Sequence, residues 1–142
     1  MIASAFMKRI IHAGFFLFLF VSWFGLLWWL SSRAVTMPGG PEITHIDKVY
    51  HFGFFFGGSG LFCAFLYRLF DNQPDWGQLL WITMIVMTAI GAIDEWHQSL
   101  HPSRSGNDAM DLCADVFGSL FGYRVFRWLH RWLEPRDRAQ SS

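Results

Sequence analysis

Ionisable and amide side chains gather in three short stretches of a chain that is otherwise strongly apolar. Such groups can bind polar ligands, exchange protons or hold a metal ion. An arginine or lysine side chain binds phosphate or carboxylate, and a carboxylate accepts hydrogen bonds from a sugar or an ammonium group. The candidate site residues are Asp47, Lys48, His51, Asp94, Glu95, Gln98, Arg104, Asp108, Asp111 and Asp115.

Helical spacing places members of each stretch on a common helix face. Asp47 and His51 are four residues apart, as are Asp94 and Gln98, and side chains at this spacing are neighbours on a helix. A longer stripe with steps of three and four is formed by Asp108, Asp111, Asp115, Gly118 and Gly122. This stripe predicts a helix whose acids face the interior of a bundle while its glycines permit close packing.

The composition determines what kind of element must position these residues. Of the 142 residues, 53% are hydrophobic and 15% are charged, against about 25% charged in an average soluble domain. Eleven basic and eleven acidic residues give a net charge of zero, and no basic block is present that would attract a nucleic acid. We therefore expect a membrane protein with lipid as a partner and no nucleic-acid partner.

The hydropathy pattern predicts an all-α integral membrane bundle of four transmembrane helices in a single domain, residues 1–142. The helices are expected over residues 10–30, 47–70, 76–98 and 108–133. The first contains 21 residues without a charged side chain, which is about 30 Å of helix and longer than a signal-peptide core. The last is expected to continue as a C-terminal interfacial helix, and residues 134–142 to be disordered.

The distribution of basic residues predicts the topology. Four crossings place both termini on the side that carries eight basic residues, leaving three on the opposite side, Arg33, Lys48 and Arg104. Because basic residues favour the cytoplasmic side, we expect cytoplasmic termini in a multi-pass protein of the bacterial inner membrane. Cys63 and Cys113 are expected to be two buried thiols rather than a disulfide. No HExxH, GxSxG, P-loop or dinucleotide-binding motif is present. His97 and His101 are spaced as a zinc pair could be, but two histidines alone are a weak signal, and no cofactor is expected.

Three motifs in order resemble those of the VanZ-like family of small membrane proteins. They are the stretch from His45 to Phe52, the residues Asp94–Gln98 with Pro102–Gly106, and the residues Asp111–Gly118. Ser103 stands where that family usually has glycine. The resemblance extends over about residues 47–122. It implies a role in the cell envelope, in tolerance to a glycopeptide antibiotic, and a polar site in the membrane, without naming a reaction.

The site residues admit several functions. The pocket could bind an envelope lipid headgroup or a glycopeptide-type ligand, with Arg104 as the principal cation. Alternatively, Glu95, Asp111 and Asp115 could act in a metal- or carboxylate-dependent hydrolase or transferase acting on a lipid-linked substrate. A third alternative is a structural ion-pair network, and a fourth is ion-coupled transport. A second copy of the chain is a further candidate partner, in a homo-oligomer.

Overall fold

The described part of the chain contains helices and no strands, which confirms the all-α prediction. The computed structural model describes residues 2–33, 46–102, 106 and 108–133. Within these residues lie α1 (Ile2–Ser31), α2 (Ile46–Leu69), α3 (Trp76–Ser99), α4 (Ala109–Leu129) and the short 3-10 helix η1 (His130–Leu133). The predicted disordered tail, residues 134–142, lies outside the described residues.

The helix boundaries differ from the predicted ones at the two outer ends. The first helix begins at Ile2 rather than at residue 10, because Lys8 and Arg9 bound the apolar stretch but are themselves good helix formers. The last α-helix ends at Leu129 and tightens into η1, so the predicted continuous helix to residue 133 is interrupted. Such 3-10 turns are frequent at helix ends.

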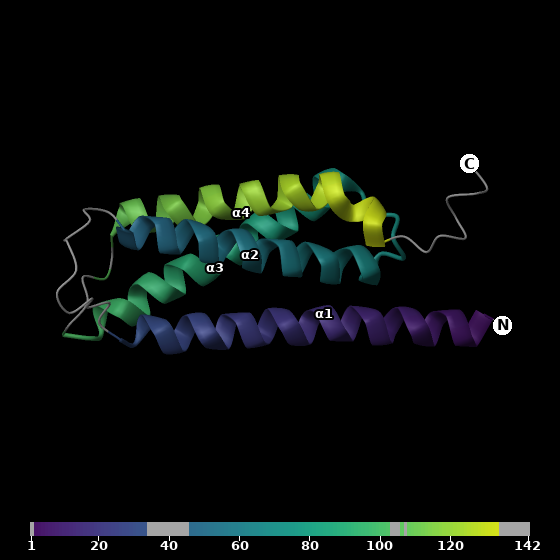
Figure 1. The fold of residues 1–142 in the computed structure, drawn as a ribbon, viewed down its shortest axis with the longest axis horizontal. Helices are drawn as coiled ribbons and strands as arrows, with labels where there is room; N and C mark the ends of the chain where they lie inside the picture. The colour runs from purple at the N-terminus through teal and green to yellow at the C-terminus, as the bar shows by residue number, and fades with distance from the viewer. Residues whose placement is uncertain (1, 34–45, 103–105, 107, 134–142) are drawn as a thin grey trace.

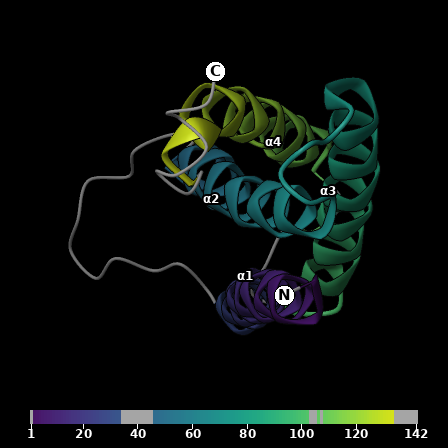
Figure 2. The same cartoon turned by 90° about the vertical axis from the view of Figure 1, so that its right-hand side faces the viewer.

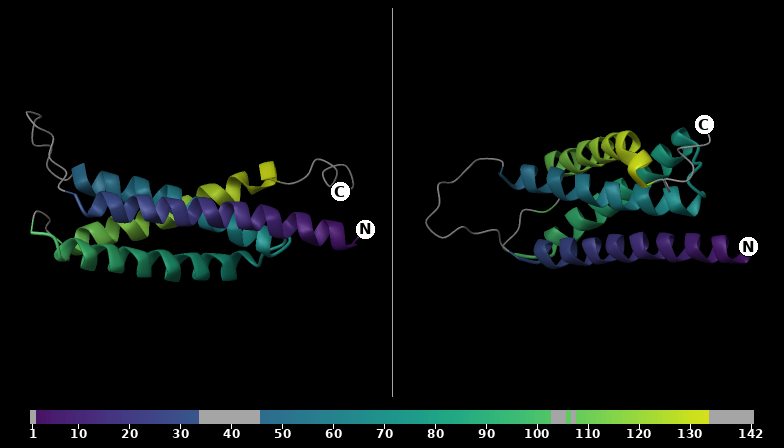
Figure 3. Two further views of the ribbon diagram at one scale, coloured as in Figure 1. Left: turned by 90° about the horizontal axis from the view of Figure 1, so that it is seen from below. Right: turned by 45° about the vertical axis from the view of Figure 1, so that its right-hand side comes forward.

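The four long helices run alternately up and down the bundle (Figure 1). At one end, Arg9 of α1 lies 3.9 Å from Asp71 in the α2–α3 turn, and Tyr123 of α4 donates a hydrogen bond of 2.9 Å to the carbonyl of Trp76. Seen end-on, α2 lies between α1 and α4, and α3 crosses along one side (Figures 2 and 3). The last turns of α1 and α3 and the first turns of α2 and α4 therefore share the opposite end.

Helices α2 and α4 pack with their backbones in close contact. A Cβ on Gly118 would overlap the carbonyl oxygen of Phe52, and a Cβ on Gly122 would overlap that of Phe56. Both glycines are buried, and they continue the stripe of acids further along α4. The predicted inward face of this helix is therefore confirmed.

The indole ring of Trp23 in α1 packs closely against α2. Trp23 donates its indole N–H to the carbonyl of Phe54 at 3.0 Å. A Cβ on Gly57 would lie 2.9 Å from the ring of Trp23, and one on Gly58 would lie 3.1 Å from it. The absence of side chains at these two positions makes room for the indole.

Among the described helices, three are long and apolar enough to cross a membrane, namely residues Phe6–Ser31, Ile46–Leu69 and Trp76–Ser99. We conclude that this is a membrane protein. Helix α4 is not among the three, because it carries Asp111 and Asp115 as well as basic residues. Cys63 is buried, but Cys113 is exposed, which corrects the expectation of two buried thiols. Two residues along a helix turn by about 200°, so Cys113 faces away from Asp111.

Candidate functional site

The polar groups meet at the end of the bundle where α2 and α4 begin. Lys48 in the first turn of α2 lies at the centre of what we call the lysine cluster. Its Nζ is 3.1 Å from Asp47 Oδ2, 2.8 Å from Asp108 Oδ2 and 2.9 Å from Asp111 Oδ1. An ammonium group has three N–H donors, and these three carboxylates satisfy all of them. The donors of Lys48 are therefore used by carboxylates of the protein itself.

Asp108 links this cluster to the start of α4. Its side chain caps the helix by accepting a hydrogen bond of 2.8 Å from the backbone N–H of Met110, as an N-cap aspartate does. The hydrogen bond from Lys48, together with that from Met110, holds the pKa of Asp108 below its usual value. The lysine cluster therefore also fixes the position at which α4 begins.

A second pair lies one turn deeper. His51 Nδ1 is 2.9 Å from Asp115 Oδ1, and the side chain of Asp115 has no exposed surface. Gly91 in α3 leaves room for the carboxylate of Asp115, since a Cβ on Gly91 would lie 2.7 Å from Asp115 Oδ2. The contact fixes the imidazole ring and leaves its Nε2 atom for another partner.

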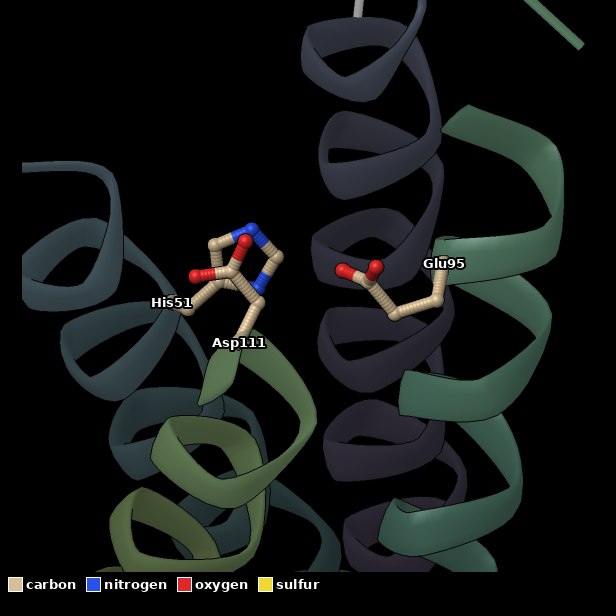
Figure 4. A group of neighbouring side chains, drawn as sticks. All are labelled: His51, Glu95 and Asp111. Carbon is tan, nitrogen blue, oxygen red and sulfur yellow. The ribbon is translucent and has the colours of Figure 1, made fainter. Parts of the chain in front are cut away.

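Glu95 of α3 faces His51 and Asp111 from across the bundle (Figure 4). Its Oε2 accepts a hydrogen bond of 2.8 Å from the backbone N–H of Asp108, whereas Oε1 is buried without a hydrogen-bond partner. Ligand atoms of His51, Glu95 and Asp111 all lie within 4.8 Å of one another. Groups from α2, α3 and α4 therefore converge on one small space, where they could hold a cation or exchange a proton.

Asp94, the neighbour of Glu95 on α3, belongs to a third group. Gln98 donates a hydrogen bond of 2.8 Å to Asp94 Oδ2, and Ser31 at the end of α1 donates one to Oδ1. Beside them is a cavity of about 430 Å³ between α1, α2 and α3. Its lining comprises Leu27, Trp29, Leu30, Ser31, Arg33, Asp47, Tyr50, His51, Phe54, Asp94 and Gln98.

Ser31 and Arg33 are two of the cavity residues that the sequence analysis did not identify as site residues. Ser31 is buried against Asp94, and nothing in the sequence distinguishes it from other small residues that end an apolar segment. Arg33 stacks its guanidinium on the ring of Trp29, 4.1 Å from the centroid. Its position just after the first apolar segment was used for topology, although a basic residue at a membrane boundary can also serve a ligand.

The predicted site residues divide between these groups. Lys48, Asp108 and Asp111 form the lysine cluster with Asp47, which also lines the cavity, while His51 connects the cavity to Asp115 and Glu95. Asp94 and Gln98 line the cavity. Arg104, predicted as the principal cation, lies outside the described residues, as does His45.

Comparison of the chain with protein-family models, curated proteins and solved structures found no match to any of them. The resemblance to the VanZ-like family therefore stays a prediction that rests on the three motifs. What the site can do is argued below from its own residues.

Proposed function

We propose that this chain is a VanZ-like protein of the bacterial inner membrane, in which four helices cross the bilayer and both termini are cytoplasmic. Helix α4 runs parallel to α2 over 21 residues, which is about 31 Å and enough for a hydrocarbon core. Its two buried acids are covered by α2 and α3, so the helix need not expose them to lipid. On this topology the polar site lies at the outer leaflet.

We further propose that the 430 Å³ cavity binds the polar headgroup of an envelope lipid. The observation that carries this proposal is the mixed lining of the cavity. Asp94, Gln98 and Ser31 contribute polar side chains to it, and Leu27 and Phe54 contribute apolar ones. A cavity of this size takes a small polar group, so a glycopeptide-type ligand could place only a part of itself there.

The polar lining specifies the chemistry of the headgroup. The carboxylates of Asp47 and Asp94 accept hydrogen bonds, which favours a hydroxyl or a primary ammonium group on the ligand. Arg33 at the same cavity is suited to a phosphate through its planar fork of donors. A phospholipid headgroup with a terminal N–H or O–H donor meets both requirements.

Lipid binding to the purified protein tests this proposal. Native mass spectrometry should show retention of phosphatidylethanolamine and phosphatidylglycerol, and much weaker retention of phosphatidylcholine, whose quaternary ammonium has no N–H donor. Asp94→Ala should weaken retention about tenfold, the effect of losing a charge-assisted hydrogen bond. Asp71→Asn, at the other end of the bundle, is the matched control. Equal retention of all three lipids by the wild type and by Asp94→Ala would exclude a specific headgroup site.

A second candidate function is hydrolysis or group transfer on a lipid-linked substrate. The observation that favours it is the buried contact between His51 and Asp115, with Glu95 facing His51 (Figure 4), because an imidazole oriented by a carboxylate is a common general base. The retained lipid distinguishes the two functions. Recovery of unaltered lipid after incubation supports binding alone, whereas release of a headgroup that stops in Glu95→Gln supports catalysis.

A further inference from the structure

We propose that His51, Glu95 and Asp111 form a binding site for one divalent first-row transition-metal ion, with Asp115 as the carboxylate that orients His51. The inference goes beyond headgroup binding and does not rest on it. The three side chains come from α2, α3 and α4, and their ligand atoms lie within 4.8 Å of one another. All three residues are buried, with 6%, 4% and 4% of their surfaces exposed.

The surroundings of His51 are those of a metal ligand. A histidine that binds a metal through one ring nitrogen usually donates the other ring N–H to a carboxylate or carbonyl, which fixes the ring and its tautomer. Asp115 Oδ1 lies 2.9 Å from His51 Nδ1, so in this arrangement Nδ1 carries the proton. The lone pair of Nε2 is then available for a metal ion.

Glu95 supplies an independent observation. Its Oε1 is fully buried and has no hydrogen-bond partner, and the side chain extends toward His51 and Asp111 (Figure 4). Buried carboxylate oxygens are ordinarily satisfied by a donor or a cation. A bound metal ion satisfies this oxygen without moving the Oε2 atom from the backbone N–H of Asp108.

The neighbouring acids show why the ion belongs at this position. Asp47, Asp108 and Asp111 also approach one another within 4.8 Å, but the ammonium of Lys48 already contacts all three. Among the described residues, His51 is the one basic side chain that pairs with Asp115, and no basic side chain forms an ion pair with Glu95. Asp111 borders both groups, since it can keep Lys48 on Oδ1 and offer its other oxygen to a metal.

The donor set indicates the kind of metal. One imidazole nitrogen with two carboxylates suits a divalent ion such as Mn²⁺, Fe²⁺ or Zn²⁺ better than Mg²⁺ or Ca²⁺, which favour oxygen ligands. Mn²⁺ is the best probe because carboxylates bind it well, whereas the His97–His101 pair, with Nε2 atoms 3.3 Å apart, would favour Zn²⁺.

The test is a Mn²⁺ titration of the full chain in a non-ionic detergent after treatment with a chelator. Electron paramagnetic resonance of the free ion should give about one tightly bound ion per chain. We expect Glu95→Gln to weaken binding at least about tenfold, and Asp115→Asn to weaken it on the order of 10- to 100-fold, as loss of such a supporting carboxylate does. Asp108→Asn removes the same charge from the lysine cluster, keeps the helix cap and should change affinity less than about threefold.

Each other result overturns the proposal. A larger loss in Asp108→Asn than in Glu95→Gln would move the ion to the lysine cluster, and unchanged binding in every variant would indicate surface binding. A spectroscopic measurement on the wild type covers the case in which a variant does not fold. Pulsed resonance of the bound Mn²⁺ should show coupling to one imidazole nitrogen, and the absence of ¹⁴N coupling would exclude His51 as a ligand.

Discussion

At the scale of single residues, the site contains more carboxylate groups than basic groups. The ammonium of Lys48 is shared by three carboxylates, and His51 faces Asp115, while Asp94 relies on hydrogen bonds from Ser31 and Gln98. Lys48 was predicted as a ligand-binding cation, but its donors are already used within the protein. A second cation or a ligand rich in donors is the natural complement of such a site.

The ion pair between Lys48 and Asp108 predicts an acid-sensitive contribution to stability. Because the pKa of Asp108 is lowered in the folded protein, its contribution is present above the unfolded pKa and is lost as the pH falls through the folded value. Asp108→Asn keeps the cap of α4 and removes this contribution. The melting temperatures of wild type and variant in detergent should therefore differ at neutral pH and converge in acid.

Repeating this comparison in chains that also carry Lys48→Met isolates the contribution of the ion pair between Lys48 and Asp108. Without the ammonium group, Asp108→Asn should produce a much smaller pH-dependent difference in melting temperature, because the interaction that lowers the pKa of Asp108 is gone. A pH-dependent difference of the original size in that background would assign the effect to Met110 and the helix cap instead.

At the scale of the helices, the α2–α4 pair is the most tightly packed element of the bundle. Gly118→Ala should destabilise the protein by about 1–3 kcal/mol, because the added methyl group overlaps the carbonyl of Phe52 and forces the helices apart. Gly53→Ala is the matched control, since a Cβ at Gly53 meets no atom within 4 Å. Reversible unfolding in mixed micelles measures both variants, and equal stabilities would show that the two helices separate without cost.

Helical periodicity predicted the inward face of α4 but not all of its partners. Asp111, Asp115 and Gly118 follow one another at four- and three-residue steps, so the periodicity of an α-helix placed them on one stripe. The contact of Ser31 with Asp94 joins residues 63 positions apart, and no local pattern encodes it. Trp23 was likewise interpreted only as part of an apolar segment, although its indole N–H donates a hydrogen bond from α1 to α2.

At the scale of the whole molecule, the direction of each helix predicts which ends face the outside. In a chain with Cys63→Ala and Cys113→Ala, a cysteine at Leu100 should react with a membrane-impermeant maleimide in spheroplasts. Cysteines at Gln73 and Arg131 should react only after permeabilisation. All three native side chains are exposed, so each position is accessible from its own side. Labelling at Arg131 in sealed spheroplasts would mean that α4 does not cross the membrane.

The burial of Asp111 and Asp115 against α2 has a consequence for the biosynthesis of the protein. An aspartate in the middle of an isolated helix raises the free energy of its insertion by about 2.5–3.5 kcal/mol, so α4 gains little by entering lipid alone. Its partners Lys48 and His51 belong to a helix that leaves the ribosome earlier. On the proposed four-helix topology, insertion of α4 therefore depends on α2, and a substitution that removes Lys48 or His51 would reduce the fraction of chains in which α4 inserts.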